Sequence, residues 1–403
     1  MGDAVDRFRS TIGEQQWQRL LCRLAELNCQ VKTRGIRSYR EWDLITGYDC
    51  GEFWDWDLYF ENIYMSYYGI HRYCRMNLER FLDTQVESGF IARNLVNPYL
   101  RDQFKPFLVQ IALLGYRQSG DCRWLQGEYY DRLRRYLSYW FWYCDHDRNG
   151  LPVWDGAAHS GMDNQFRRTG DNGAALCEGV DLACYLVREL DAMTLLAEAL
   201  GAAEDAREYR AHAKALRELI AVTYWHEEDG FYYDRNERSG DVIRVRTVAG
   251  FLPLWADACD KAKAERLVHE HLLNEREFWL PYPVATWAKT EPDYYQQRIE
   301  DECNWRGPTW VPTNYMVFHG LRRYGHDELA RELAYRTFDM VMSENDTREF
   351  YNAETGAGQG RNPFWGWSSL GYFMPLEWEM DYDPTDPATQ IHPIAMEALG
   401  VAF

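Results

Sequence analysis

The distribution of apolar residues along the chain predicts a protein built from paired helices. Between residues 182 and 200 apolar side chains recur at steps of three, four and seven, which places them on one helix face. Gly201 ends this helix, and the same spacing over 209–220 predicts a second helix that folds back on the first. A second hairpin of helices is expected on either side of Gly325, with Asp327 as the cap of its second helix.

Helical spacing also covers most of the remaining chain. Further helices are expected near residues 5–32, 57–72, 75–88, 103–119, 124–144, 246–256, 261–273 and 364–377. Strand signals are short, and one β-hairpin is expected between 231–233 and 242–245, around a turn with Asn236 and Gly240.

About a dozen paired helices fit either a solenoid or a closed ring. A solenoid shows self-similar repeats, and this chain has none that are visible. The alternation of strands and helices that marks a parallel sheet is also missing. We therefore expect one all-α domain over residues 1–403, a closed ring of paired helices with short β-hairpins in its loops.

The charge of the chain limits its partners. Lys and Arg number 44 against 63 Asp and Glu, a net charge of −19, which argues against nucleic acid and against an anionic membrane surface. No apolar run reaches about 18 residues, so no transmembrane helix is expected. No export signal is visible, and ten scattered cysteines without a CxxC pair suggest reduced thiols. A cytoplasmic protein is the expectation, with Cys184 as a small core residue.

Aromatic residues make up 16% of the chain, and many of them stand beside polar residues in loops. Four loops combine carboxylates, amides or arginines with large rings: 51–60, 159–167, 304–310 and 348–367. Sugars need this mixture, because their C–H faces stack on rings and their hydroxyls bind carboxylates and amides. Hydrolysis of a glycosidic bond further needs two carboxyl groups, one protonated and one ionised. In any single loop the aspartates could cap helices and the tryptophans could fill the core. Four such loops together favour a sugar site.

Five short motifs in these loops resemble one clan of enzymes. Trp56–Phe60 resembles a trehalase motif, and Ser160–Asn164 resembles the loop of glycoside hydrolase family 63 that carries the general acid. Arg167 matches an arginine that follows the acid in trehalases. Trp305–Pro308 is similar to a Trp-Arg-Gly-Pro motif, and the segment from Glu349 to Gly356 resembles the loop of the general base. The resemblance covers roughly residues 45–378, in the same order, and it implies that the expected ring is an (α/α)6 barrel of six inner and six outer helices.

The resemblance implies an inverting, exo-acting α-glycosidase of small α-glucosides, such as a disaccharide, glucosylglycerate or mannosylglycerate. Asp163 would be the general acid and Glu349 the general base, separated by roughly 6.5–9.5 Å so that a water fits between base and sugar. No cofactor is required. The residues expected to bind the sugar are Trp54, Trp56, Asp57, Gln103, Asn164, Arg167, Trp305, Arg306, Trp365 and Trp367.

The chain departs from the family pattern at two places. Ala357–Arg361 replaces the Gly-rich lid of trehalases, which weakens trehalose itself as the substrate. Gln165-Phe166 stands where family 63 has Ser-Pro, so the subsite beyond the scissile bond is expected to differ. Arg361 or Arg167 could meet a carboxylated aglycone such as glycerate.

Two interpretations are possible for the segment from Asp145 to Gly150. Asp145, Asp147 and Asn149 lie at positions 1, 3 and 5 of a calcium-loop pattern, and Glu178 could complete the site as in some family 63 members. The alternative is an Asn-Gly turn capped by aspartates.

Two other functions compete with the glycosidase. A sugar isomerase or epimerase on the same ring would use histidine pairs, and His159 is the only histidine in the four loops. A non-catalytic sugar-binding protein would not need both carboxylates. Among the other histidines, His269 and His271 are two apart on an expected helix, so we expect them to be solvated and unable to share a metal.

Overall fold

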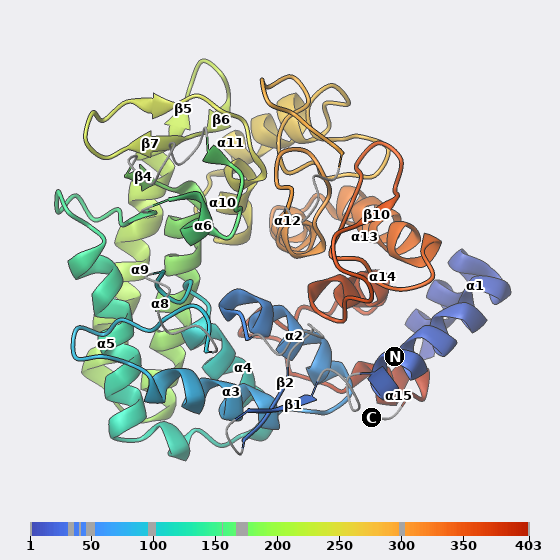
Figure 1. Ribbon diagram of the computed structural model, residues 1–403, viewed down its shortest axis with the longest axis horizontal. Helices are drawn as coiled ribbons and strands as arrows, with labels where there is room; N and C mark the ends of the chain where they lie inside the picture. Colours follow the sequence, from blue (N-terminus) through green and yellow to red (C-terminus); the bar gives the residue numbers. More distant parts are fainter. Residues whose placement is uncertain are drawn as a thin grey trace.

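The computed structural model describes residues 2–30, 36–39, 42–45, 53–95, 102–154, 156–166, 176–297 and 303–401. Within these residues six elements form a closed inner ring, in which each packs on the next and the last returns to the first (Figure 1). In order they are α2 (Asp55–Tyr67), α4 (Leu108–Ser119), α8 (Val180–Ala199), α10 (Leu252–Trp255), α12 (Val311–Arg323) and η6 (Trp367–Tyr372). The predicted (α/α)6 barrel is confirmed.

Outer helices cover this ring. They are α1 (Gly2–Gln30), α3 (Arg72–Asp83), α5 (Glu128–Tyr143), α9 (Ala203–Thr223), α11 (Lys261–Arg266), which continues into the π-helix η5 (Leu267–Leu272), and α13 (Asp327–Ser343). Shorter helical pieces are η2 (Arg123–Leu125), α6 (Ala157–Ser160), η4 (Val248–Phe251), α14 (Met374–Glu379) and α15 (Ile394–Leu399). The two predicted hairpins correspond to α8–α9 and α12–α13, which pack against each other in pairs.

Inner and outer helices differ in how much of their surface is buried, and their sequences differ accordingly. Every residue of α2 is buried, and so is nearly all of α8 and α12, because an inner helix has neighbours on all sides. The outer helix α9 buries only one stripe, formed by Ala206, Ala213, Leu216 and Ile220. These stripes at helical spacing are the signal that made the hairpins predictable.

The helices at the two ends of the chain pack against each other. Helix α1 packs on α14 and α15, and Figure 1 shows the blue N-terminal helix beside the red C-terminal ones. The Arg7 guanidinium donates to Glu379 Oε2 at 2.7 Å, and Phe8 makes edge-to-face ring contacts with Trp17 and Phe338. The N-terminal helix is therefore an outer element that packs on α14 and α15, which follow the last inner element η6.

The strands are short and lie in the loops. The described strands are β1 (Ile36–Tyr39), β2 (Trp42–Ile45), β3 (Val153–Trp154), β4 (Cys177–Glu178), β5 (Trp225–His226), β6 (Phe231–Tyr232), β7 (Asp234–Asn236), β8 (Val242–Ile243), β9 (Phe350–Tyr351) and β10 (Gly358–Gln359). All pairs are antiparallel, and β3, β4, β7 and β8 form one four-stranded sheet in that order.

One strand of the predicted β-hairpin was placed wrongly. The turn lies where expected, since the Asn236 N–H donates to Asp241 O, but the strand before it is Asp234–Asn236. The segment from Phe231 to Tyr232 pairs instead with Trp225–His226, where the Trp225 and Tyr232 rings lie 4.9 Å apart. An earlier tryptophan thus offered these residues a better cross-strand partner.

The prediction for the two neighbouring histidines was wrong for His271. This side chain is buried, and its Nδ1 lies 2.7 Å from Glu277 Oε2 while its Nε2 lies 2.7 Å from Asp229 O. His269 faces solvent on the same π-helix. Cys184 is fully buried, as predicted. Among the described residues, no helix combines the length and apolar character needed to cross a bilayer.

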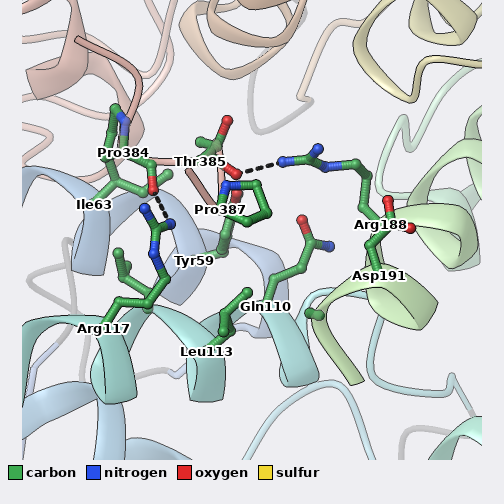
Figure 2. Close-up of a pocket in the computed structure, with 12 residues that line it drawn as sticks. Tyr59, Ile63, Gln110, Leu113, Arg117, Arg188, Asp191, Pro384, Thr385 and Pro387 are labelled. Carbon is green, nitrogen blue, oxygen red and sulfur yellow. Dashed lines mark hydrogen bonds between the residues drawn. The ribbon is translucent and has the colours of Figure 1, made fainter. Parts of the chain in front are cut away.

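A small hollow lies among later residues of α2, α4 and α8. Figure 2 shows Arg117 and Arg188 reaching the C-terminal segment that covers it. Arg117 donates to Pro384 O at 2.8 Å, and Arg188 donates to Thr385 O at 2.6 Å. The hollow has about 20 Å³, which is room for about one water molecule. It is therefore too small to hold a sugar.

Candidate active site

A larger cavity opens where α2, α12 and η6 begin. It has a volume of about 300 Å³, at the lower end of the roughly 300–1,000 Å³ typical of small-molecule sites. The residues that line it are Trp54, Trp56, Asp57, Arg93, Asp102, Gly161, Asp163, Cys303, Trp305, Trp310, Glu349, Arg361 and Trp367. They come from the loops that the sequence marked as rich in rings and carboxylates, together with the segment around Arg93.

Asp163 reaches the cavity from a tight turn after α6. The Ser160 Oγ accepts the Met162 N–H at 3.1 Å, and Gly161 has a φ of 79°, which favours glycine. A Cβ at Gly161 would lie 2.5 Å from Lys105 Cε and 3.0 Å from the Trp56 ring. The turn therefore packs tightly against Lys105 and Trp56. This contact fixes the position from which Asp163 projects.

The surroundings of Asp163 favour its protonated form. Burial raises the pKa of Asp163 to about 6, and the negative charges of Glu349 and Asp55 act in the same direction against the lowering effect of Arg93 and Lys105. Within the described residues no protein group donates a hydrogen bond to this carboxyl group. Asp163 can therefore hold a proton up to about pH 6 and has a free direction in which to donate it.

Glu349 is held in a different way. Its Oε2 accepts the Arg361 N–H at 2.9 Å, and its Oε1 lies 3.5 Å from the Cys303 Sγ. The Trp367 indole donates to the backbone carbonyl of Glu349 at 2.9 Å. Hydrogen bonds donated to a carboxylate stabilise its ionised form. Glu349 is 4% exposed and fixed at three points, which suits a base that must aim at one water molecule.

Aromatic rings form much of the cavity wall. Trp305 stacks on Trp310 with ring centroids 3.7 Å apart, and Trp310 stacks on Phe350 at 4.5 Å. Trp56 lies 5.6 Å from Trp305 and 5.8 Å from Trp367. Such flat, rigid surfaces suit the C–H faces of a sugar ring.

One wall tryptophan offers an unused hydrogen-bond donor. The indole nitrogen of Trp310 donates to Asn304 O at 2.8 Å, whereas the Trp305 Nε1 is buried without an acceptor among the described residues. A buried donor left without a partner costs about 1–3 kcal/mol. A hydroxyl group of a ligand in the cavity can supply that acceptor.

A fully buried ion pair lies next to the residues that line the cavity. The Lys105 Nζ lies 3.0 Å from Asp55 Oδ1, and the Lys105 N–H donates to Asp55 Oδ2 at 2.8 Å. Both side chains are 0% exposed. Arg93 adds a second cation 4.0 Å from Asp55 and covers the Trp54 ring at 4.9 Å. The pair ties the first turn of α2 to the segment before α4.

The structure brings most of the predicted site residues to the cavity. The two catalytic candidates line it together with Trp54, Trp56, Asp57, Trp305 and Trp367. Arg361, the candidate for an anionic aglycone, also lines it. Arg167 lies outside the described residues.

Four predicted sugar-binding residues lie elsewhere. The Asn164 side chain joins two loops, with Oδ1 accepting the Trp305 N–H at 2.8 Å and Nδ2 donating to Asn304 Oδ1 at 3.1 Å. Gln103 is buried, and its Oε1 accepts the Ile91 N–H. The Arg306 guanidinium lies 5.9 Å from the Tyr295 ring, and Trp365 lines a separate small hollow beside Tyr372. Within the described structure these four therefore shape the loops around the cavity.

Sequence reasoning missed several lining residues. Asp102, Gly161, Cys303 and Trp310 stand inside or next to the marked motifs, so a wider window around each motif would have found them. Arg93 comes from a segment without a motif, which β-bridges from Ala92 to Gln103 and from Asn94 to Trp54 place beside α2.

The four calcium candidates also come together. Asp145 accepts the N–H groups of Asn149 and Gly150 at 3.1 and 3.0 Å, and the Asn149 side-chain amide lies between Asp147 and Glu178. Glu237, which the sequence did not suggest, places a carboxylate oxygen within 4.8 Å of oxygens of Asp145 and Asp147.

Two observations fit a cation at this cluster. The Glu178 Oε2 is buried without a hydrogen-bond donor, and burial raises the pKa values of Asp145 and Glu178. The carboxylates of Asp145, Asp147, Glu178 and Glu237 also match the oxygen-only preference of calcium, which takes 6–8 ligands, whereas the Asn149 amide now donates to two of them. The donor set therefore fits calcium, in a structural position away from the residues that line the cavity.

Comparison with known proteins places the site in context. Residues 52–368 match the family model described as a mannosylglycerate hydrolase MGH1-like glycoside hydrolase domain. The mannosylglycerate hydrolase of Thermus thermophilus is 35% identical over 147 residues, 36% of this chain and 33% of that protein. The mannosylglycerate hydrolase MGH1 of Selaginella moellendorffii is 30% identical over 198 residues, 48% and 37% of the two chains. The matched segments thus span about a third of these curated relatives.

Solved structures agree in fold over a longer range. The GH63 mannosylglycerate hydrolase from Thermus thermophilus in complex with glucose has a TM-score of 0.69 at 20% identity, covering 90% of this chain and 99% of that one. Neutral trehalase Nth1 from Saccharomyces cerevisiae has a TM-score of 0.64 at 16% identity, covering 88% and 80%.

Proposed function

The chain belongs to the family of mannosylglycerate hydrolase MGH1-like glycoside hydrolase domains, and from this premise we propose that it is an inverting, exo-acting α-glycosidase of a small α-glycoside. One observation carries the proposal: among the carboxyl groups of one cavity lined with tryptophans, those of Asp163 and Glu349 lie in different environments. Burial raises the pKa of Asp163 to about 6, which favours its protonated form, whereas Glu349 receives hydrogen bonds that favour its charge.

The proposed reaction uses both groups in one step. Asp163 donates its proton to the glycosidic oxygen as the bond between this oxygen and C1 breaks. Glu349 takes a proton from a water molecule, whose oxygen forms a new bond to C1 on the opposite face of the sugar. An α-glycoside then releases its sugar as the β-anomer. Residues of the cavity wall hold the sugar between the two carboxyl groups.

Two features of the cavity support a small substrate with an acidic aglycone. Its volume of about 300 Å³ suits a sugar and a short substituent better than a polysaccharide. Arg361 lines the cavity next to Glu349 and can pair with a carboxylate. Glycosylglycerates therefore stand first among the proposed substrates, ahead of uncharged disaccharides.

A hydrolysis screen followed by proton NMR tests the function. The panel is mannosylglycerate, glucosylglycerate, trehalose, kojibiose, nigerose, maltose, isomaltose and sucrose. Early appearance of the β-sugar from an α-linked member supports the proposal. Early appearance of the α-sugar means retention and removes the water-activating role from Glu349. If none of the members is hydrolysed, the proposed substrate class is wrong.

The selectivity for an acidic aglycone has its own test. Replacing Arg361 by glutamine should raise KM for a glycosylglycerate about 10- to 100-fold, because hydrogen bonds to a charged group contribute about 1.5–3 kcal/mol. The backbone N–H that Arg361 donates to Glu349 remains, so kcat should change little. Michaelis–Menten kinetics measure both, with Arg331→Gln on the outer helix α13 as the matched control. An equal rise in KM for an uncharged glycoside of the same sugar would contradict the assignment.

We also propose that a calcium ion binds Asp145, Asp147, Asn149, Glu178 and Glu237. These residues join the loop after α5 to the four-stranded sheet, so the ion would stabilise this corner of the barrel. Its contribution would be structural.

Removal of calcium tests this second proposal. Dialysis against a calcium chelator should lower Tm, because an ion present at about 100 times its Kd stabilises the folded state by about 2.7 kcal/mol. Glu178→Gln should lower Tm in calcium and remove the response to the chelator, while Glu208→Gln on the outer helix α9 serves as control. If the chelator leaves Tm unchanged, the loop is an Asn-Gly turn capped by aspartates.

A further inference from the structure

Three side chains with metal-binding atoms meet on the outside of the barrel. Glu265 is in α11, His269 is in the π-helix η5 that follows it, and His326 precedes α13. One ligand atom of each lies within 4.8 Å of the other two. None of the three lines the sugar cavity. Two of them are far from the third in sequence, so the fold alone brings the cluster together.

Two distances within this His-His-Glu cluster are close to the spacing of ligand atoms in a tetrahedral zinc site. Glu265 Oε2 lies 3.3 Å from His269 Nε2, and Glu265 Oε1 lies 3.6 Å from His326 Nε2. Zinc binds imidazole nitrogens at 2.0–2.1 Å and carboxylate oxygens at 2.0–2.2 Å, so neighbouring ligand atoms of a tetrahedron are roughly 3.3 Å apart. The side chains of Glu265 and His269 are exposed and would rotate to bring one oxygen of Glu265 and the two nitrogens onto one ion.

The state of His326 is an independent indication of a ligand. Its side chain is 10% exposed, and its Nε2 is buried without a hydrogen-bond partner among the described residues. This nitrogen faces Glu265 at 3.6 Å, which is too long for a hydrogen bond. A buried polar atom of this kind usually has a partner. A metal ion would take its lone pair.

The charges around the cluster favour a cation. Asp327 and Glu328 follow His326 in the first turn of α13. Arg266, next to Glu265 in sequence, is already paired with Glu227 and Glu270, at 2.8 and 2.9 Å. Two imidazoles with one carboxylate select zinc or a related transition metal over calcium or magnesium, which prefer oxygen ligands only.

We propose that Glu265, His269 and His326 form a zinc-class metal site on the outer ring, with water as the fourth ligand. The ion would tie the α11–η5 segment to the start of α13. The site is distinct from the sugar cavity and from the acidic calcium cluster, and it does not depend on the proposed glycosidase activity.

Calorimetric titration with zinc chloride tests the site. The protein carries no histidine tag, has been stripped of metals by chelator, and is kept in excess calcium so that the acidic cluster is saturated. We expect one zinc ion per chain and a rise in Tm of about 3–5 °C at zinc hundredfold above its Kd. Absence of binding, or zinc binding without a change in Tm, overturns the proposal.

Matched variants show whether the ion lies where proposed. His326→Ala, His269→Ala and Glu265→Gln should each weaken zinc binding at least about 100-fold and abolish the rise in Tm. His392→Ala removes another histidine paired with a glutamate, at 3.8 Å, and should leave zinc binding unchanged. If His326→Ala fails to fold, the exposed His269 and Glu265 variants decide the question. Binding that survives these substitutions places the ion elsewhere and overturns the proposal.

Discussion

Replacing Asp163 by asparagine is expected to lower kcat by at least about 100- to 10,000-fold, the contribution typical of a general acid. Asparagine has nearly the same shape and can still occupy the turn after Gly161, but it cannot give a proton to the leaving oxygen. Because the cavity wall is unchanged, KM or the Kd of a sugar ligand should shift by less than about tenfold. The ratio of these two effects separates a catalytic role from damage to the site.

The pH dependence of kcat/KM, compared between the unsubstituted enzyme and Asp163→Asn, gives a second test of the role of Asp163. Burial raises the pKa of Asp163 to about 6, so the proton needed for catalysis is present below pH 6 and is lost as pH rises through that value. In the unsubstituted enzyme kcat/KM should therefore decline above about pH 6. Asp163→Asn should lack this alkaline decline in whatever activity remains, because no proton leaves an amide.

Two controls make the result interpretable. Asp121→Asn changes a half-exposed aspartate paired with Arg123 on the surface, and it should leave kcat unchanged. Glu349→Gln should be as inactive as Asp163→Asn, and the double variant should be little worse than either, because the two groups act in one step. An Asp163→Asn enzyme with unchanged kcat would show that another group supplies the proton.

The fold was predictable because burial dictates composition. The inner helix α8 carries apolar residues around most of its circumference and α9 carries one stripe, so the sequence distinguishes an inner helix from an outer one. The error at Phe231–Tyr232 arose because strand pairing depends on a cross-strand partner, here Trp225, that lies outside the local pattern.

Part of the site was predictable from the types of residue in the loops, above all from the carboxyl groups. Three carboxyl groups of the ring-rich loops, those of Asp57, Asp163 and Glu349, line the cavity, whereas Asp55 in the first of these loops pairs with Lys105. Asn164 shows the limit of this reasoning, because a side-chain amide can form hydrogen bonds with the protein backbone as readily as with a sugar. Its hydrogen bonds go to the loop of Trp305.

The role of Arg93 depends on its neighbours in space rather than in sequence. Two β-bridges carry its segment to α2, where it approaches Asp55 and covers Trp54. No local pattern could have indicated this position. The same is true of His326, whose partners Glu265 and His269 lie in another hairpin of the ring.

Replacing Lys105 by methionine is expected to lower the free energy of unfolding by about 3–5 kcal/mol, the loss typical when one partner of a buried ion pair is removed. Methionine fills a similar volume, so the loss comes from charge rather than from a cavity. It leaves Asp55 fully buried, with the Lys105 backbone N–H and the Arg93 guanidinium 4.0 Å away as its remaining partners. Urea denaturation followed by circular dichroism measures the change.

The double variant Lys105→Met/Asp55→Asn tests whether the unpaired charge is the cause. Once asparagine replaces Asp55 the buried carboxylate that lost Lys105 is no longer charged, so the double variant should be more stable than Lys105→Met alone. Lys214→Met serves as the control, because Lys214 and Glu218 are 77% and 70% exposed and an exposed pair contributes about 0–1 kcal/mol. Lys105 also lies 5.3 Å from the Trp56 ring and packs on the turn before Asp163, so kcat should fall with stability. A Lys105→Met protein as stable as the Lys214→Met control would mean that the pair does not hold the cavity together.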